Sequence, residues 1–278
     1  MSEGSQGKVA LISGAARGQG RAHALRLARD GVSIVGLDIC QQIDSVDYPM
    51  ATKQDLDDTV AQVEALGQRM LGCVTDVRDR EAVEGAYAAG LAEFGRVDFI
   101  VANAGIMPIW GRYADTDAAW QDCLDVMLTG VMHVVEAGWP RLVEQGSGGS
   151  IVITSSIGAV RPMMRTLGGR TLGMLGYCSV KGGLVTLMEN YASILAPHNI
   201  RVNTVHPTGV NTPMVDNDMV RDRFANANEE DLKALVNAIP VDMVESEDIA
   251  DAVAWLCSDE SKFYTGQAMR IDAGAALR

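Results

Sequence analysis

Short apolar segments alternate along the chain with longer segments in which apolar residues recur at helical spacing. The apolar segments predict strands at 8–13, 32–38, 70–76, 97–105, 149–156, 200–207 and 267–274. The longer segments predict helices near 18–30, 55–66, 80–94, 117–145, 177–197 and 246–258. Strands that are apolar on both faces and are joined by crossover helices are typical of a doubly wound parallel sheet. We therefore expect a single α/β domain over residues 1–278, with helices on both faces of one sheet.

Two stretches interrupt this alternation. Residues 40–54 (CQQIDSVDYPMATKQ) form an insertion after the second predicted strand, and residues 211–240, rich in Met and Asn, follow the sixth. Long loops in compact domains are usually functional or mobile, and ligands bind at the carboxyl ends of the strands in open α/β sheets. We predict that 211–240 is a lid over a substrate.

A glycine-rich turn joins the first predicted strand to the first predicted helix, in the segment SGAARGQG. Gly14, Gly18 and Gly20 allow a sharp turn and a close backbone approach to a pyrophosphate, which the helix amino terminus attracts. Asp38 ends the second strand, where a carboxylate can bind the ribose hydroxyls and repel a 2′-phosphate. Arg17 is a weaker opposing signal, because its guanidinium can pair with a phosphate. The pattern favours NAD over NADP.

Polar residues also follow the next two predicted strands. Asp76 ends the third strand, and Asn103, Ala104 and Gly105 end the fourth. At the carboxyl edge they can contact an adenine and shape the floor of a cofactor cleft. Taken singly, Asp76 can instead cap the helix that follows, and Asn103 can bond a neighbouring turn.

The segment YCSVK places Tyr177 and Lys181 four residues apart, which is one turn on the same face of a helix. Such a pair is either an acid–base device or a tyrosine at the edge of the core beside a lysine whose stem is buried. Taken alone, the two residues favour the second interpretation, because such pairs are common on amphipathic helices.

Composition narrows the functional classes. Of the 278 residues, 47% are hydrophobic and 21% charged, which suffices for a packed core. The net charge of −13 argues against a nucleic-acid-binding protein, which needs a basic face. The five cysteines and four histidines are dispersed, so we expect a reducing environment and no metal site. The start, MSEGSQGK, has no apolar signal region, and no run of membrane-spanning length follows, so we expect a cytoplasmic protein without a membrane anchor.

Taken together, the motifs resemble the short-chain dehydrogenase/reductase family over essentially the whole chain. The motifs that carry the resemblance are SGAARGQG (13–20), NAG (103–105), ITSS (153–156), YCSVK (177–181), RVNTVHPTGVNT (201–212) and TGQAMRIDAG (265–274). The resemblance implies a Rossmann-type sheet. The insertion and the segment that ends in VNTPM are similar to a subgroup that includes carveol dehydrogenases and is associated with the redox cofactor mycofactocin.

The resemblance resolves the question of Tyr177. It implies that Tyr177 transfers the proton, that Lys181 favours its phenolate and bonds the nicotinamide ribose, and that Ser156 steadies the substrate oxygen. Ser155 is the alternative for that last role if the register differs by one residue. An unperturbed tyrosine, with a pKa of about 10, would be a poor base at neutral pH without such help.

The resemblance also implies a set of NAD-binding residues, in which Pro207, Val210 and Thr212 hold the nicotinamide carboxamide. The full set is Gly14, Arg17, Gly18, Gln19, Gly20, Asp38, Asp76, Val77, Asn103, Ala104, Gly105, Tyr177, Lys181, Pro207, Val210 and Thr212. The implied substrate is a secondary alcohol, cyclic or terpenoid-like, and its ketone. An external redox carrier and a homotetramer are the implied partners. The segment 157–176, with three arginines and three methionines, is predicted to be a remodelled substrate wall.

One position departs from the family. Met127 stands where the family carries an asparagine that holds a water in a proton relay from the active-site lysine. A thioether is a weak acceptor and donates nothing. The relay is therefore rebuilt from other groups, or proton exchange is slow, or the chain is a nucleotide-binding regulatory or scaffold protein with little catalysis. A further interpretation is that Met127 fills a gap in a helix that no longer bends around a water.

Overall fold

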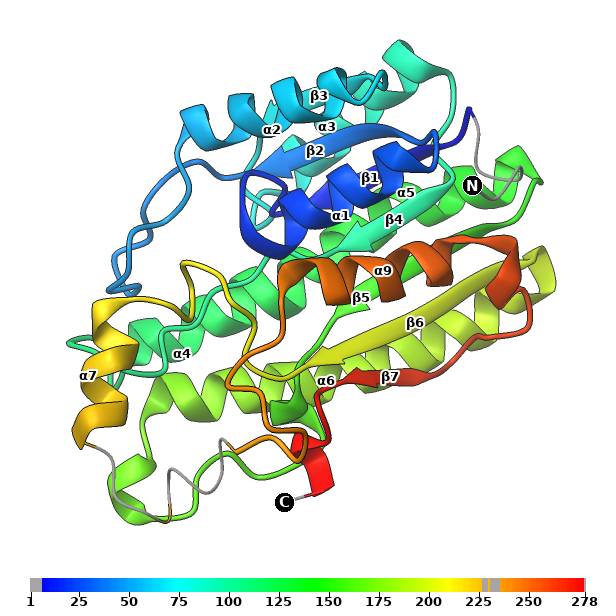
Figure 1. Cartoon of the computed structure of the whole chain (residues 1–278). Helices are drawn as coiled ribbons and strands as arrows, with labels where there is room; N and C mark the ends of the chain where they lie inside the picture. Colours follow the sequence, from blue (N-terminus) through cyan, green and yellow to red (C-terminus); the bar gives the residue numbers. More distant parts are fainter. Residues whose placement is uncertain (1–6, 227–229, 231–235, 278) are drawn as a thin grey trace.

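The computed structural model describes residues 7–226, 230 and 236–277. Within them, one parallel sheet of seven strands has the order β3-β2-β1-β4-β5-β6-β7 (Figure 1). Its strands are β1 (Val9–Ser13), β2 (Ser33–Asp38), β3 (Met70–Val74), β4 (Phe99–Ala102), β5 (Gly149–Thr154), β6 (Ile200–Pro207) and β7 (Ala268–Ile271). The order reverses between β1 and β4, which is the switch point where doubly wound sheets bind ligands. The predicted fold is confirmed.

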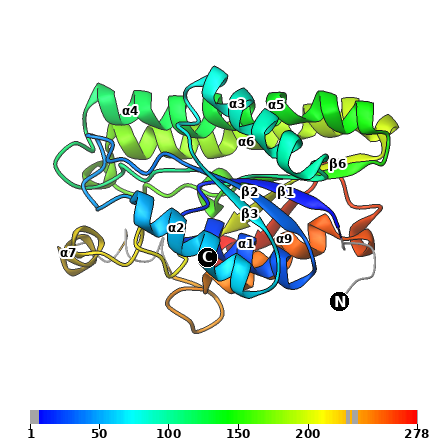
Figure 2. The same ribbon diagram turned by 90° about the horizontal axis from the view of Figure 1, so that it is seen from above.

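Helices cover both faces of the sheet (Figure 2). One face carries α1 (Gly18–Arg29), α2 (Lys53–Ala65) and α9 (Ser246–Cys257). The other carries α3 (Arg80–Phe94), α4 (Asp117–Leu124), α5 (Gly130–Gln145) and α6 (Leu172–Leu195). Helix α7 (Asp218–Asn226) lies away from both layers (Figure 1). Short 3-10 turns occur at Ile157–Ala159, Leu167–Gly169, Ala196–His198, Asp259–Ser261 and Ala275–Leu277.

The sheet separates two apolar layers of the core. Successive strand residues alternate between them: Leu11 packs in the layer under α3 and α5, and Ile12 packs in the layer under α1 and α9. Both side chains are fully buried. This burial on both faces explains why the strands read as continuous apolar segments.

Strands β3, β4, β5 and β7 end earlier than expected, and the ends of β3 and β4 bear on the site. Strand β4 ends at Ala102 because the Asn103 backbone N–H turns aside to the Ser13 hydroxyl, at 3.0 Å, and leaves the ladder. Strand β3 ends at Val74, so Asp76 lies in the loop that follows. Both polar residues therefore project from the first positions after a strand.

Two predicted helices also differ from expectation. Helix α6 begins at Leu172, five residues before its predicted start, because the Thr171 hydroxyl caps it by accepting the Met174 N–H at 3.0 Å. The single helix expected over 117–145 is interrupted by a π-helical turn, Asp125–Thr129, between α4 and α5. Such turns are frequent at functional sites, and this one contains Met127.

None of the helices in the described part of the chain is long and apolar enough to cross a membrane.

Candidate active site

The glycine-rich turn has the geometry that its sequence predicts. Gly14 and Gly18 have φ angles of +70° and +54°, which side chains other than glycine rarely adopt. A Cβ at Gly20 would lie 1.9 Å from the Gly14 carbonyl oxygen. The backbone therefore folds tightly against itself and exposes the start of α1 to a cavity.

That first cavity lies at the switch point of the sheet. It is lined by Gly14, Arg17, Gly18, Gln19, Gly20, Asp38, Asp76, Val77, Asn103, Ala104, Gly105 and Thr212 among other residues. All of these are residues that the sequence assigned to NAD. The structure thus brings together residues from the ends of four strands and from the segment after β6.

Asp38 is held in a fixed orientation inside this cavity. Its carboxylate is 8% exposed and accepts the backbone N–H groups of Ala16 and Cys40, both at 3.0 Å. Burial raises the pKa of Asp38, and the two N–H bonds oppose that rise. A carboxylate aimed in this way is suited to accept hydrogen bonds from ribose hydroxyls.

Arg17, the residue that could pair with a phosphate, is partly engaged within the protein. Its guanidinium donates to the Pro49 carbonyl oxygen at 2.6 Å, so it is tied to the insertion 40–54. It still lines the cavity, although its Nη2 group is engaged.

The insertion 40–54 supplies cavity residues that the sequence analysis missed. Ile43, Tyr48 and Met50 line the first cavity. Tyr48 is 3% exposed, and its hydroxyl accepts the Met107 N–H at 3.0 Å. The insertion therefore connects the loop after β2 with the loop after β4. The apolar residues and the single tyrosine of this segment were the signal available from the sequence.

Asp76 and Asn103 both reach the cavity but are also engaged elsewhere. Asp76 Oδ2 accepts from the Arg78 guanidinium at 2.7 Å, and Asp76 Oδ1 accepts the Arg78 N–H at 2.9 Å. The Asn103 amide donates to the Ser13 carbonyl at 3.1 Å and accepts from the Thr154 hydroxyl at 3.1 Å. Asn103 thus joins β1, β4 and β5 beneath the cavity. This agrees with the alternative interpretation that Asn103 bonds a neighbouring segment.

A second and larger cavity, of about 800 Å³, continues from the first. The two share Gln19, Asn103, Gly105 and Thr212 in their linings. Ser156, Tyr177, Lys181, Pro207 and Val210 line the second cavity, so each of the remaining predicted residues is there. Its walls are mostly apolar.

Tyr177 and Lys181 lie one turn apart on α6 and point into this cavity. The Lys181 ammonium lies 5.6 Å from the centroid of the Tyr177 ring and donates to the Thr154 carbonyl at 2.9 Å. Burial raises the pKa of Tyr177 to about 12, opposed by its hydrogen bond with Ser156. Burial lowers the pKa of Lys181 to about 8. Both groups are therefore pushed toward their neutral forms in the protein alone.

The two serines of ITSS have different roles. Ser156 Oγ accepts the Gly158 N–H at 3.1 Å and faces the cavity near Tyr177. Ser155 Oγ donates to the Lys181 carbonyl at 2.9 Å and is 3% exposed, so it braces α6. The hydrogen bond between Ser156 and Tyr177 favours the register in which Ser156 meets the substrate.

His206 is a site residue that the sequence analysis missed. It is fully buried, and its Nδ1 lies 2.9 Å from the Ser156 carbonyl oxygen. Its Nε2 lies 2.8 Å from the Thr204 hydroxyl. Donation from Nδ1 fixes the tautomer and joins β6 to the serine segment. No sequence signal distinguished this histidine from a core residue.

Met127 is fully buried in the wall of the second cavity. A Cβ at Gly105 would lie 3.5 Å from the Met127 sulfur, so the side chain packs beside the NAG turn. The π-helical turn is present around it. The thioether therefore fills space in the wall, at an irregular turn of the helix.

The predicted substrate wall, 157–176, lines the second cavity with only some of its residues. From the segment 157–176, Met163 and Met174 line the second cavity. Arg161 donates to the Ala275 carbonyl, and Arg170 donates to Asp115 at 2.9 Å, so these arginines support the wall from outside.

The segment after β6 also borders the cavity. Helix α7 contributes Val220 and Phe224, and the Phe224 ring meets Trp110 edge-on at 6.3 Å between centroids. The predicted lid residues 227–229 and 231–235 lie outside the described residues.

Among the residues that the structure describes, no three His, Cys, Asp or Glu side chains are grouped as metal ligands.

Lys181→Met should change how stability depends on pH. Because the folded pKa of Lys181 is lowered to about 8, the unfolded chain binds more protons from there up to the ordinary pKa of 10.5. The free energy of unfolding of the nucleotide-free protein should rise across this window, by on the order of 3 kcal/mol. In the variant, this rise should be absent. Urea unfolding at about pH 8 and about pH 10.5 measures the difference. Lys53→Met, an exposed lysine, is the control. Identical pH slopes in wild type and Lys181→Met would contradict this.

The doubly wound sheet, with its glycine-rich turn and polar strand ends around one cleft, defines a Rossmann-type dinucleotide fold. A family model described as enoyl-(acyl carrier protein) reductase matches residues 14–276. The chain belongs to the short-chain dehydrogenase/reductase family.

Similar proteins extend over nearly the whole chain. An uncharacterized oxidoreductase of Mycobacterium tuberculosis is 49% identical and covers 97% of this chain and 96% of its own length. The (-)-trans-carveol dehydrogenase of Rhodococcus erythropolis is 37% identical, with coverage of 98% and 99%. The crystal structure of carveol dehydrogenase from Mycobacterium avium in complex with NAD is 42% identical, with a TM-score of 0.89 and coverage of 98% and 99%.

Proposed function

We propose that this protein is an NAD-dependent oxidoreductase that interconverts a secondary alcohol, cyclic or terpenoid-like, and its ketone. The observation that carries the proposal is the joint placement of Tyr177, Lys181 and Ser156 in one apolar cavity. That cavity continues into the cleft formed by the glycine-rich turn. The family membership and the relatives named as carveol dehydrogenases support the same reaction class.

The cleft fits NAD in its charge and shape. The close approach of Gly20 to Gly14 leaves room for a pyrophosphate at the start of α1. Asp38 suits unphosphorylated ribose hydroxyls. The Gln19 side-chain oxygen is buried without a hydrogen-bond partner among the described residues, which suits a ligand donor at the join of the two cavities. Bound NAD would supply the hydride acceptor for alcohol oxidation.

The chain's own residues would manage the proton. Ser156 would hold the substrate oxygen against Tyr177, and the Tyr177 phenolate would take the hydroxyl proton. The Lys181 ammonium favours the phenolate electrostatically, which offsets the burial that raises the pKa of Tyr177 to about 12. The apolar walls exclude water and strengthen these interactions.

The lining of the second cavity favours an apolar substrate. Met107, Trp110, Met163 and Phe224 supply adaptable and aromatic surface. The Arg221 guanidinium also reaches this cavity, but Asp216 and Asp218 pair with it. An uncharged cyclic alcohol matches this lining better than a carboxylate does. We propose the segment 211–240 as the lid that covers it.

The decisive experiment combines two measurements on the purified protein. Mass spectrometry after denaturation identifies any nucleotide that was retained. Hydride transfer from carveol and related cyclic alcohols is then assayed, with added NAD and separately with an artificial electron acceptor. Retained NAD and activity with the artificial acceptor would support the proposed external carrier. An absence of hydride transfer under both conditions, over a broad alcohol panel, would contradict the proposed enzyme.

Asp38→Ala should change cofactor preference. The Kd for NAD should rise about tenfold or more, because hydrogen bonds to a charged group are lost, at about 1.5–3 kcal/mol each. The Kd for NADP should fall because the repulsion of its phosphate is removed. Calorimetric titration with both nucleotides measures the change. Asp57→Ala removes an exposed carboxylate from α2 and is the matched control. An unchanged Kd for NAD in Asp38→Ala would place the ribose elsewhere.

A second candidate function, nucleotide binding with little catalysis, rests on Met127. Met127→Asn restores a donor and an acceptor in the π-helical turn. If proton release limits the enzyme, turnover should rise in this variant and the solvent deuterium isotope effect should shrink. Met163→Asn, on another wall of the cavity, is the control. Equal turnover in wild type and Met127→Asn would show that proton release is not limiting.

We also propose a homotetramer, as the family resemblance implies. Light scattering of the purified protein tests this directly, and a monomeric mass would exclude it.

A further inference from the structure

A third cavity, of about 440 Å³, lies at the opposite edge of the sheet from the proposed active site. Its lining comes from the amino ends of strands: Lys8 precedes β1, Phe99 begins β4, Gly149 begins β5 and Arg201 lies at the start of β6. The segment after α9, through Thr265, closes it. Nothing in the proposed reaction uses this cavity.

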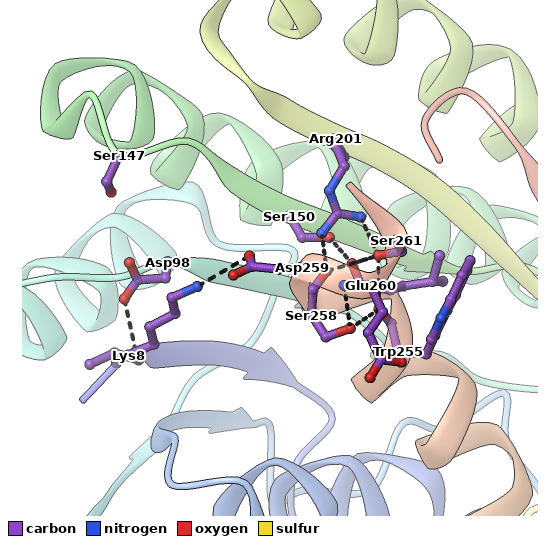
Figure 3. Close-up of polar contacts among 12 residues, drawn as sticks. Lys8, Asp98, Ser147, Ser150, Arg201, Trp255, Ser258, Asp259, Glu260 and Ser261 are labelled. Carbon is purple, nitrogen blue, oxygen red and sulfur yellow. Dashed lines mark hydrogen bonds and ion pairs between the residues drawn. The ribbon is translucent and has the colours of Figure 1, made fainter. Parts of the chain in front are cut away.

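The two carboxylates in the lining are already engaged. Asp98 is 2% exposed, accepts the Val9 N–H at 3.0 Å and pairs with the Arg96 guanidinium, whose Nε lies 2.8 Å away. It also accepts from Gln145 at 3.2 Å. Asp259 lies 3.9 Å from the Lys8 ammonium (Figure 3). Each carboxylate therefore has one cation of the cavity as its partner.

Two further cations in the lining have no such partner. The half-buried Arg201 guanidinium donates to the Ser261 hydroxyl at 2.8 Å and to the Ser258 carbonyl at 3.2 Å, both neutral groups (Figure 3). Lys262 lies over the Phe263 ring, at 5.3 Å from its centroid. In the described part of the chain, neither cation has a carboxylate within 4.0 Å. Burial opposes the charged form of Arg201, and Asp259, which favours that form, lies beyond 4.0 Å, so a closely bound anion would stabilise the guanidinium.

The cavity thus has four cations, from Lys8, Arg96, Arg201 and Lys262, against two carboxylates. The excess of two positive charges is local, because the whole chain carries a net charge of −13. Hydroxyl donors are also available. Ser147 Oγ accepts from Gln145 at 2.9 Å and Thr265 Oγ1 accepts the Val202 N–H at 3.1 Å, which leaves each hydroxyl proton to donate.

We propose that this cavity binds a phosphate dianion, either inorganic phosphate or the phosphate group of a monoester. The charge of the dianion equals the local excess. Arginine and lysine are the side chains that most often bind phosphate oxygens, and hydroxyl groups complete such sites. The site is separate from the glycine-rich turn, since the two lie at opposite edges of the sheet. Binding there stabilises the folded chain by mass action.

The test is a titration of inorganic phosphate into the protein at about pH 8 and constant ionic strength, followed by calorimetry, with NAD present in excess. NAD occupies the glycine-rich turn if the proposed function holds, and the variants identify the phosphate site even if it does not. We expect one saturable phosphate per chain. Lys262→Met should raise the Kd for phosphate about tenfold or more, since it removes a cation of the cavity that has no carboxylate partner. Because the Lys262 side chain is exposed, the substitution should leave the fold intact. Lys8→Met should also raise it.

Lys53→Met is the matched control, because it removes the same charge from α2, outside the cavity lining. Its Kd should stay within about twofold of the wild-type value. Saturable binding that is lost only in the cavity variants would establish the site. Titration with a sugar phosphate then distinguishes a monoester site from one that takes only the inorganic ion. No saturable binding, or the same Kd in wild type and Lys262→Met, would overturn the proposal.

Discussion

Tyr177→Phe is expected to lower kcat for alcohol oxidation by about 10²–10⁴-fold, with little change in the Kd for NAD. The reason is that the phenol is the proposed proton acceptor, and general acid–base catalysis contributes a factor of this size. The change removes one oxygen from a ring that otherwise keeps its packing on α6. Single-turnover hydride transfer, followed by absorbance of the reduced nicotinamide, measures the loss.

The matched control for this prediction is Tyr113→Phe. The Tyr113 ring is 38% exposed and lies outside the lining of both proposed cavities, so its loss of a hydroxyl should leave kcat unchanged. Equal activity in Tyr177→Phe and the wild type would assign the proton transfer to another group. A similar loss in both variants would point to a general effect of the substitutions on the fold.

Gly20→Ala is expected to abolish measurable NAD binding and to destabilise the fold. The new Cβ would lie 1.9 Å from the Gly14 carbonyl oxygen and 3.0 Å from the Asn103 amide nitrogen, so the backbone of the turn must move. Overpacking of this kind costs about 1–3 kcal/mol. Opening the turn also displaces the N–H groups proposed to hold the pyrophosphate. Urea unfolding and nucleotide titration measure the two effects separately.

Gly85→Ala is the control for this substitution. Gly85 lies in α3, and a Cβ there meets nothing within 4 Å. This variant should be more stable by about 0.5–1 kcal/mol, because alanine loses less conformational freedom in a helix. If Gly20→Ala unfolds like the wild type, the turn is not the tight structure described above. If it is only destabilised and still binds NAD, the pyrophosphate site lies elsewhere.

The sequence predicted the parallel sheet because its strands are buried on both faces. Successive apolar residues such as Leu11 and Ile12 point to opposite faces of a strand, so both faces of the sheet must be covered to bury them. The same reasoning located Gly14 and Asp38 at the ends of strands, and Gly20 in the first turn of the helix that follows β1. The pair Tyr177 and Lys181 followed from helical spacing, but its proposed role needed the family resemblance.

Element boundaries were less predictable because side chains distant in sequence decide them. The hydroxyl of Ser13 draws the Asn103 N–H out of the ladder and ends β4. The hydroxyl of Thr171 begins α6 five residues early. The π-helical turn at Met127 packs against α6, which is distant along the chain, and no local pattern reports that contact.

Local sequence thus determined the layered fold, the glycine-rich turn and the carboxyl edge as the place of the site. These follow from hydrophobic period and from conformations that glycine alone adopts easily. Only the tertiary structure decided that Arg17 bonds Pro49, that Tyr48 supports the loop at Met107 and that His206 holds Ser156. Each of these contacts joins residues that are at least 32 positions apart. Such contacts exist only once the sheet has brought its loops together, because spacing along the chain carries no information about them.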